Sequence, residues 1–167
     1  ALTGRLSDEI LSLASIGTVA DLVPIIGENR NLVKEGLVTL KQTKLPGLMA
    51  LKNAGKLQGD LTSEDIGFVI GPRLNAVGRL QDASLAVDLL LEEDPVLASE
   101  MAMEVEKLNQ ERQKLVQQIT SEAIELVESE YKDDHVLVIA KEDWNPGVLG
   151  IVASRLLNQY HRPTIML

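Results

Sequence analysis

The stretch from Asp94 to Glu130 constrains the fold most, because it contains no glycine and no proline after Pro95. Aspartate is a good helix cap, and proline fits the first helical position, where its missing N–H would have no partner in any case. Apolar residues recur in steps of three, four or seven, interrupted near the middle by Arg112: Leu97, Met101, Val105, Leu108, Leu115, Ile119, Ala123 and Leu126. The pattern predicts one continuous helix of ~50 Å, at about 1.5 Å per residue. Such a helix forms a coiled-coil arm or connects two domains.

The chain before this helix has short helical patterns separated by glycine and proline. Ser7 followed by Asp8 and Glu9 is typical of a helix start, with a hydroxyl cap and carboxylates near the positive helix end. Further helices are expected at 32–42, 48–53, 62–70 and 84–90, with loops at 27–31 and around Gly55 and Gly59.

The chain after the long helix has a different pattern. Val136–Ala140 is a β-branched run typical of a buried strand, and Thr164–Leu167 is a second one. Between them come a loop at Trp144–Gly147 and a helix over 148–158. Strand, helix and strand at this spacing predict a parallel βαβ unit, with ligands favoured at the carboxyl ends of its strands. The fold class expected is therefore α/β: a mostly helical first part, the long helix, and the start of a βαβ domain.

Composition limits the kinds of function that are open to the chain. Its 167 residues carry a net charge of −9, which argues against a general nucleic-acid coat or a membrane-surface protein. Any anion site must therefore be local. There is no cysteine, so neither a disulfide framework nor a thiolate metal site is expected. Without an apolar run near 18 residues or a signal peptide, we expect a soluble, cytoplasmic protein without membrane contact. The missing initiator Met and the apolar strand at Leu167 suggest a fragment.

Two windows without any aspartate or glutamate are the places where an anion site is expected. The first runs from Ile66 to Gln81 and contains Arg73 and Arg79, whose planar guanidinium groups suit phosphate. We expect its glycines to form a turn that approaches a ligand closely. The alternative is a tight helix–turn–helix corner whose arginines pair with nearby carboxylates. The second window, 144–167, covers the amino end of the expected helix, where free N–H groups favour an anion, and it also includes Ser154, Arg155 and Arg162.

Asp21 is the only charged residue between Glu9 and Glu28. An aspartate in an apolar run is costly to bury unless something pairs with it. A backbone N–H, a distant cation and a metal ion are all possible partners. The structural alternative is that Asp21 caps the turn at Pro24.

The order and content of three motifs resemble the RecJ family of the DHH phosphoesterase superfamily. The motifs are Gly17-Thr18-Val19-Ala20-Asp21-Leu22-Val23-Pro24, Gly71-Pro72-Arg73-Leu74-Asn75-Ala76-Val77-Gly78-Arg79-Leu80 and Trp144-Asn145-Pro146-Gly147-Val148-Leu149-Gly150-Ile151-Val152-Ala153-Ser154-Arg155-Leu156, followed by Arg162-Pro163-Thr164. The resemblance covers nearly the whole chain. It implies that 1–93 complete a DHH catalytic domain, that 94–131 form a connecting helix, and that 132–167 begin the DHH-associated domain.

The resemblance also implies an activity and roles for individual residues. The family hydrolyses single-stranded DNA from 5′ to 3′ with two metal ions, Mn²⁺ or Mg²⁺, in DNA repair and recombination. Asp21 matches a metal-ligand aspartate. Arg73 and Asn75 match catalytic positions beside the scissile phosphate. The implied nucleic-acid contacts are Arg73, Arg79, Trp144, Ser154 and Arg155, with single-stranded DNA and replication or repair proteins as partners.

The sequence departs from the family pattern in two respects. The aspartate-rich and Asp-His-His motifs that carry the other metal ligands are absent, and one carboxylate does not hold two hard cations. The segment by itself is therefore expected to be inactive. Asn145 stands where the family usually has histidine.

Two other functions remain open from the sequence. One keeps the superfamily but changes the substrate to oligoribonucleotides or cyclic dinucleotides. Trp144 and the long helix argue against it, because smaller relatives have a shorter linker. The other is a non-catalytic module that binds nucleic acid or protein partners. Asp21 argues against this, since a decayed site does not need the carboxylate.

Overall fold

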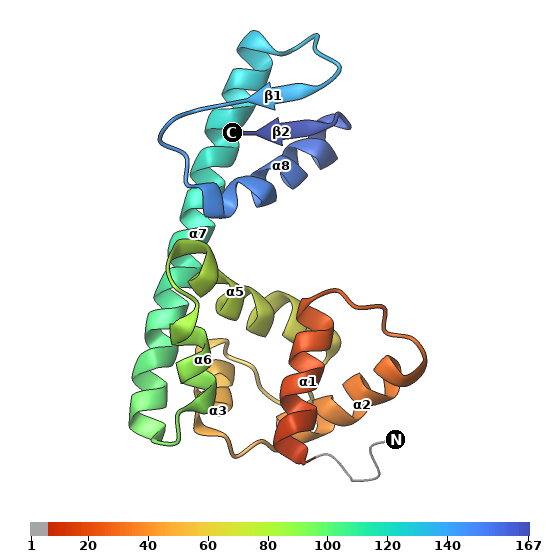
Figure 1. The fold of residues 1–167 in the computed structure, drawn as a ribbon, viewed down its shortest axis with the longest axis vertical. Coiled ribbons are helices and arrows are strands. Elements are labelled where there is room, and N and C mark those ends of the chain that lie inside the picture. The colour runs from red at the N-terminus through yellow and green to blue at the C-terminus, as the bar shows by residue number, and fades with distance from the viewer. Residues whose placement is uncertain (1–6) are drawn as a thin grey trace. The chain divides into compact units, whose positions relative to one another are not determined.

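The structure, a computed structural model, describes residues 7–167 (Figure 1). Backbone contacts divide the chain into two compact units, with the division between Asn109 and Gln110. None of the helices in the described range is long and apolar enough to cross a membrane. In chain order the elements are α1 Asp8–Ala20, α2 Gly27–Lys41, α3 Pro46–Ala54, α4 Ser63–Asp65, the π-helix η1 Ile66–Ile70, α5 Gly71–Leu80, α6 Ser84–Leu91, α7 Pro95–Glu130, β1 Leu137–Ile139, α8 Pro146–Tyr160 and β2 Thr164–Met166.

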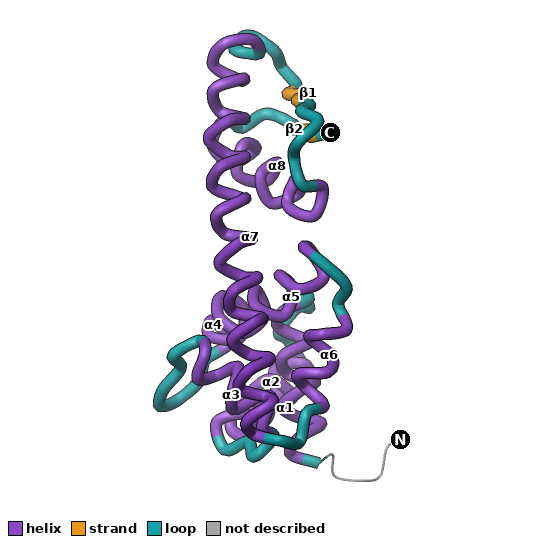
Figure 2. The backbone as a smooth tube through the Cα atoms, turned by 90° about the vertical axis from the view of Figure 1, so that its left-hand side faces the viewer, coloured by secondary structure: helices purple, strands orange, loops and turns teal. Residues whose placement is uncertain are grey.

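The prediction of one long uninterrupted helix is confirmed by α7, which Figure 2 shows without a break. The Asp94 carboxylate caps it, accepting hydrogen bonds from the backbone N–H groups of Val96 at 2.7 Å and Leu97 at 3.3 Å. The helix nevertheless belongs partly to each of the two units. The division between the units falls inside α7, so that its first half packs with the elements before it and its second half with those after it.

The buried side of α7 differs from the predicted apolar stripe in the first unit. Leu97 of the predicted stripe is 48% exposed, whereas Ala98 and Ala102, which are not part of that stripe, are buried in the core together with Val105, which is. Small alanine side chains let the helix approach the others closely, and larger neighbours such as Met101 then pack at the edge of the contact. In the second unit the buried positions of α7 are Val116, Ile119, Ala123 and Val127.

The expected turn at Gly71–Leu80 is wrong, because this stretch is helical and continues directly from η1. The helix begins as expected with a capping box, in which Thr62 Oγ1 accepts from Asp65 N and the Asp65 carboxylate accepts from Thr62 N. Proline in a regular helix lacks a donor and clashes with the carbonyl four residues earlier. The wide turn of η1, in which Gly71 N–H donates to Ile66 O, makes room for Pro72.

Other differences in the first unit lie at element ends. The 27–31 segment expected as a loop is the first part of α2. Gly36 of this helix faces α1, where an added Cβ would overlap Ser15 and lie 2.7 Å from Leu11 O. Ser12 Oγ and Thr39 Oγ1 are also hydrogen-bonded across this contact at 2.9 Å. The two helices therefore touch through small residues, with little space between their backbones.

The second unit confirms the predicted parallel strand–helix–strand arrangement. The two strands pair in parallel from Leu137 opposite Thr164 to Ile139 opposite Met166. Helix α8 packs through Val148, Val152 and Leu156, which recur every four residues and are buried. It begins at Pro146, so that half of the expected 144–147 loop forms its first turn.

Two glycine-to-alanine substitutions test the contact between α1 and α2. Gly36→Ala should destabilise the chain by about 1–3 kcal/mol, because the added methyl group overpacks the helix contact. Gly17→Ala lies in α1 with nothing within 4 Å of its Cβ position. It should stabilise the chain by about 0.5–1 kcal/mol through helix propensity. Chemical denaturation of the variants measures both, and equal effects of the two would contradict the close contact at Gly36.

Candidate functional site

Asp21 lies at the carboxyl end of α1, in a turn closed by backbone hydrogen bonds. Leu22 N–H donates to Val19 O at 3.1 Å and Val23 N–H donates to Thr18 O at 3.1 Å, the two bonds of a Schellman motif. Leu22 occupies the left-handed position with φ 56°, where glycine is usual, and its side chain is 88% exposed. A non-glycine residue in this conformation is strained by about 1–2 kcal/mol. The backbone thus fixes the position of Asp21 at some cost.

The Asp21 carboxylate is exposed, so the expected burial in an apolar run does not occur. Its side chain makes no hydrogen bond or ion pair within residues 7–167, and the alternative of a side-chain cap at Pro24 is not supported. Over the same residues no group of three or more His, Cys, Asp or Glu side chains that could hold a metal ion occurs. Mn²⁺ and Mg²⁺ need several oxygen ligands. The described residues therefore do not form a complete metal site by themselves.

The first two motifs are brought together where α1 ends and α5 begins. A Cβ at Gly71 would lie 3.2 Å from Ala20 Cβ and 3.1 Å from Ile66 O. This close approach favours glycine, because a Cβ would require its neighbours to shift by a few tenths of an ångström, and it places the start of α5 beside the residue that precedes Asp21. Sequence positions about 50 residues apart thus meet at one corner of the first unit, as contacts between α1, η1 and α5 also indicate.

Arg73 lies one turn from this corner and is half-buried. Its Nε is 2.7 Å from Glu106 Oε2 on α7, and the two side chains retain 14% and 24% of their exposure. Its Nη1 donates to Val69 O at 2.8 Å. The alternative in which an arginine of this stretch pairs with a carboxylate is therefore confirmed for Arg73, although the pair forms on a helix and not at a turn.

Because the stretch is helical, its three predicted site residues do not share a face. Arg73 lies on the side that also carries the buried Ala76 and Val77. Asn75 and Arg79 are four residues apart and lie together on the exposed side. Arg79 also falls in the last turn, where a cation interacts favourably with the helix dipole.

Trp144, in the second unit, is buried and does not present its ring to solvent. Its ring is 6% exposed, and its Nε1 donates to Glu122 Oε2 at 2.8 Å. Lys141 Nζ lies 2.7 Å from the same oxygen, and Gln118 donates to Glu122 Oε1 at 2.9 Å. The hydrogen bonds from Lys141, then Trp144 and Gln118, lower the pKa of Glu122 from 4.5 to about 2. Sequence reasoning missed Glu122, because only the fold brings these donors to it.

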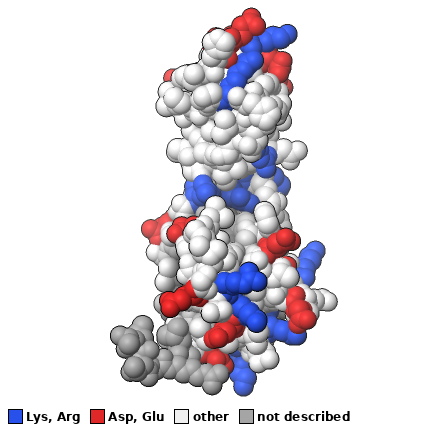
Figure 3. Space-filling view, turned by 90° about the vertical axis from the view of Figure 1, so that its right-hand side faces the viewer, with Lys and Arg blue, Asp and Glu red and all other residues white. Residues whose placement is uncertain are grey.

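Ser154 and Arg155 are both exposed on α8; Ser154 lies opposite the buried face of the helix, and Arg155 lies at the edge of that face, three residues after Val152. The Ser154 hydroxyl donates to Gly150 O at 2.9 Å. Asn145 caps the helix, its Oδ1 accepting from Gly147 N–H at 2.9 Å. On the face shown in Figure 3, most of the surface of the second unit is uncharged. The expected contacts of Trp144, Ser154 and Arg155 with nucleic acid stay predictions.

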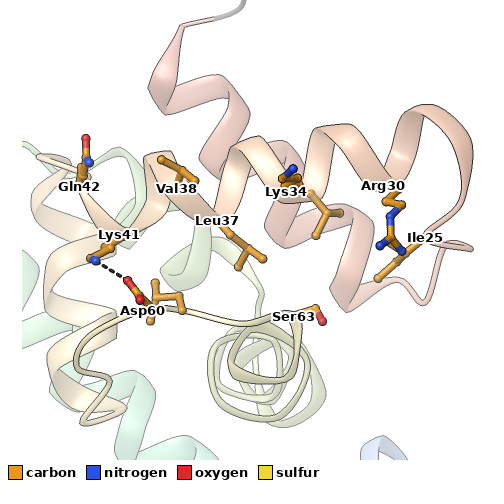
Figure 4. Close-up of a pocket in the computed structure, with 11 residues that line it drawn as sticks. Ile25, Arg30, Lys34, Leu37, Val38, Lys41, Gln42, Asp60 and Ser63 are labelled. Carbon is orange, nitrogen blue, oxygen red and sulfur yellow. Dashed lines mark hydrogen bonds and ion pairs between the residues drawn. The ribbon is translucent and has the colours of Figure 1, made fainter.

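A groove of about 520 Å³ runs along α2 and contains none of the motif residues. Arg30, Lys34 and Lys41 project along it (Figure 4), and Lys41 is ion-paired with Asp60. Asp21 and Arg73 do not line it. The groove therefore lies apart from the motif residues of the first unit.

No protein-family model matches the chain, but individual relatives do. The single-stranded-DNA-specific exonuclease RecJ of Bacillus subtilis (strain 168) is 51% identical over 168 residues, which cover 100% of this chain and 21% of that protein. The RecJ of Escherichia coli (strain K12) is 40% identical over 163 residues, covering 94% of this chain and 28% of that protein. The chain thus spans less than a third of the length of either curated relative.

Solved structures agree with these relatives. The crystal structure of RecJ from Thermus thermophilus in complex with Mg²⁺ has a TM-score of 0.88 at 35% identity, covering 98% of this chain and 26% of that one. A crystal structure of exonuclease RecJ bound to manganese has a TM-score of 0.87 at 35% identity, covering 99% of this chain and 42% of that one.

The environment of Glu122 predicts how the second unit responds to acid. A carboxylate whose pKa is lowered on folding stabilises the fold above its unfolded pKa of 4.5, and this contribution is lost as pH falls toward about 2. We expect Glu122→Gln to lower the denaturation midpoint at about pH 6 and to matter much less at about pH 3. Trp144 is the only tryptophan, so its fluorescence reports on this unit. The exposed Glu111 of α7, changed to Gln, is the control; the same pH response in both variants would refute the prediction.

Proposed function

The chain corresponds over its whole length to a segment of the RecJ family, and we propose that the protein containing it is a metal-dependent, single-stranded-DNA-specific exonuclease that hydrolyses phosphodiester bonds from the 5′ end. The observation that carries the proposal is the corner where Gly71 packs against Ala20. It joins an exposed carboxylate, Asp21, to a helix that contains Arg73. A carboxylate and an arginine held near each other suit a metal-bound phosphate.

Two features favour DNA over the alternative substrates. The curated relatives are named as specific for single-stranded DNA, including the one that is 51% identical. The chain also keeps all three motifs, and the second and third are free of acidic residues. A cyclic dinucleotide or short oligoribonucleotide substrate, and a non-catalytic binding module, have no comparable observation in their favour.

Asp21 is proposed as one ligand of a Mn²⁺ or Mg²⁺ site. Relatives crystallised with Mg²⁺ and with manganese support the choice of ions. Such an ion, when bound, would polarise the scissile phosphate and activate a water. This chain's own contribution is to hold Asp21 in a backbone-closed turn, with its carboxylate free of protein partners between residues 7 and 167.

Arg73 and Arg155 are proposed to act on the nucleic acid in different ways. Arg73 is fixed by two protein contacts, so its guanidinium can meet charge that develops on the phosphate without first being ordered. Arg155 is exposed on a helix surface, which suits a phosphate contact that sets affinity and position. A role in DNA repair and recombination, replication or repair proteins as partners, and cytoplasmic location stay predictions.

Asp21→Asn tests the metal assignment in the full-length protein. We expect exonuclease activity with Mn²⁺ to fall by about 100-fold or more, since even residues that only orient metal ligands contribute about 10- to 100-fold. Thermal stability without metal should be unchanged, because the carboxylate makes no protein contact in the described residues. Calorimetric titration with Mn²⁺ should show weaker binding.

Asp88→Asn is the matched control, because Asp88 is an exposed aspartate of α6 in the same unit. It removes the same charge and should leave activity and metal binding unchanged. Activity of Asp21→Asn within a few-fold of the parent protein would refute the ligand assignment.

Arg73→Ala and Arg155→Ala test the division of roles. In the full-length protein, Arg73→Ala should lower kcat by about 10²-fold or more, as the loss of an oxyanion donor does. Arg155→Ala should mainly raise KM and flatten the salt dependence of DNA binding, because it removes one phosphate contact. Steady-state kinetics on single-stranded DNA at two salt concentrations distinguish them. A pure KM effect of Arg73→Ala, or an unchanged salt slope for Arg155→Ala, would contradict these roles.

A further inference from the structure

The long helix supplies a carboxylate to the arginine of the second motif. Glu106 Oε2 and Arg73 Nε are 2.7 Å apart, and both atoms are buried. Within the acid-free window 66–81 the chain has no carboxylate of its own for Arg73. The partner therefore comes from α7, an element that follows α5 in the chain and packs in the same unit.

The contacts of Arg73 fix the plane of its guanidinium. Nε forms an ion pair with Glu106 Oε2 at 2.7 Å without the geometry of a hydrogen bond, and Nη1 donates a hydrogen bond to Val69 O at 2.8 Å on the preceding turn. A guanidinium carries five N–H donors in a rigid planar fork. Two contacts made through different nitrogens define the plane of that fork and leave further donors for another oxygen. At 14% exposure the side chain still reaches solvent.

We infer that Glu106 is a positioning residue for Arg73, holding the guanidinium in the orientation in which its remaining donors meet the oxygens of the scissile phosphate. The inference rests on the proposed function, in which α5 lies beside the reacting phosphate. Glu106 itself does not touch the substrate. It acts by keeping a long and otherwise mobile side chain in one rotamer, so that no ordering is required when the phosphate binds.

A purely structural ion pair would behave differently from a positioning contact. A structural pair adds stability, and its loss affects kinetics only through the folded fraction. A positioning pair transmits its effect through Arg73 alone. Removing Glu106 should then cost activity only while Arg73 is present, which is the signature of coupling in a double-mutant cycle.

The test uses the full-length protein with Mn²⁺ and a labelled single-stranded oligonucleotide. The variants are Glu106→Ala, Glu106→Gln, Arg73→Ala and the double variant Glu106→Ala/Arg73→Ala. We expect Glu106→Ala to lower kcat about 10-fold or more with KM changed by less than about 3-fold. Glu106→Gln, which keeps an acceptor oxygen, should lose less. The double variant should be within about 2-fold of Arg73→Ala alone.

Glu104→Ala is the matched control, since Glu104 is exposed on the same helix and the substitution removes the same charge. It should leave kcat and KM unchanged. Thermal unfolding of every variant identifies losses of activity that arise from unfolding at the assay temperature, and kinetics are compared at a temperature where all are folded.

Three outcomes would overturn the positioning role. The first is an unchanged kcat in Glu106→Ala. The second is that the losses caused by Glu106→Ala and Arg73→Ala multiply in the double variant. The third is a Glu106 variant that is faster than the parent protein, which would mean that the carboxylate competes with phosphate for Arg73. If the parent protein degrades no single-stranded DNA, the proposed function itself is refuted and the inference falls with it. Activity of the parent with multiplying effects refutes the positioning role alone.

Discussion

Pro72 lies inside a continuous helix, and the first unit is arranged around the way the chain accommodates it. A regular helix would bring the proline ring against the carbonyl of Phe68 and leave that carbonyl without a donor. The π-turn of η1 widens the helix at this point, with Gly71 N–H reaching Ile66 O. The same turn carries Gly71 close to Ala20. The π-turn that accommodates Pro72 thus also brings the start of the helix that carries Arg73 beside the turn that carries Asp21.

Helix α7 contributes a carboxylate to the motif residues of each unit. In the first unit Glu106 forms an ion pair with Arg73. In the second unit Glu122 forms an ion pair with Lys141 and accepts a hydrogen bond from Trp144. Ion pairs on an exposed surface contribute little, but the pair of Arg73 and Glu106, at 14% and 24% exposure, is the more buried of the two, and there the loss of a partner is more costly. The second and third motifs are thus each tied to the same long helix by a carboxylate, while apolar residues of that helix belong to the core of each unit.

The local pattern of the sequence was sufficient to predict most elements. The absence of breakers between Pro95 and Glu130 and the Asp94 cap predicted α7, and two β-branched runs around a helix predicted the parallel pair. The pair Gly71-Pro72 led to the wrong prediction of a turn, because glycine and proline usually end helices. Whether a proline ends a helix or is absorbed by a wide turn depends on what packs against that turn, here Ala20 of α1. Local propensity does not contain that information.

By itself the sequence determined candidate residues, since charge patterning isolates Asp21, Arg73 and Arg155 in an acidic chain, and its resemblance to a known family grouped them into motifs. It did not determine which of them are presented to solvent. Only the tertiary structure placed Trp144 in a packed site on Glu122, turned Arg73 toward Glu106, and left Asp21 exposed in a strained turn. The reason is physical. Exposure and pairing depend on contacts between residues tens of positions apart, and helix geometry then decides which residues of one motif share a face.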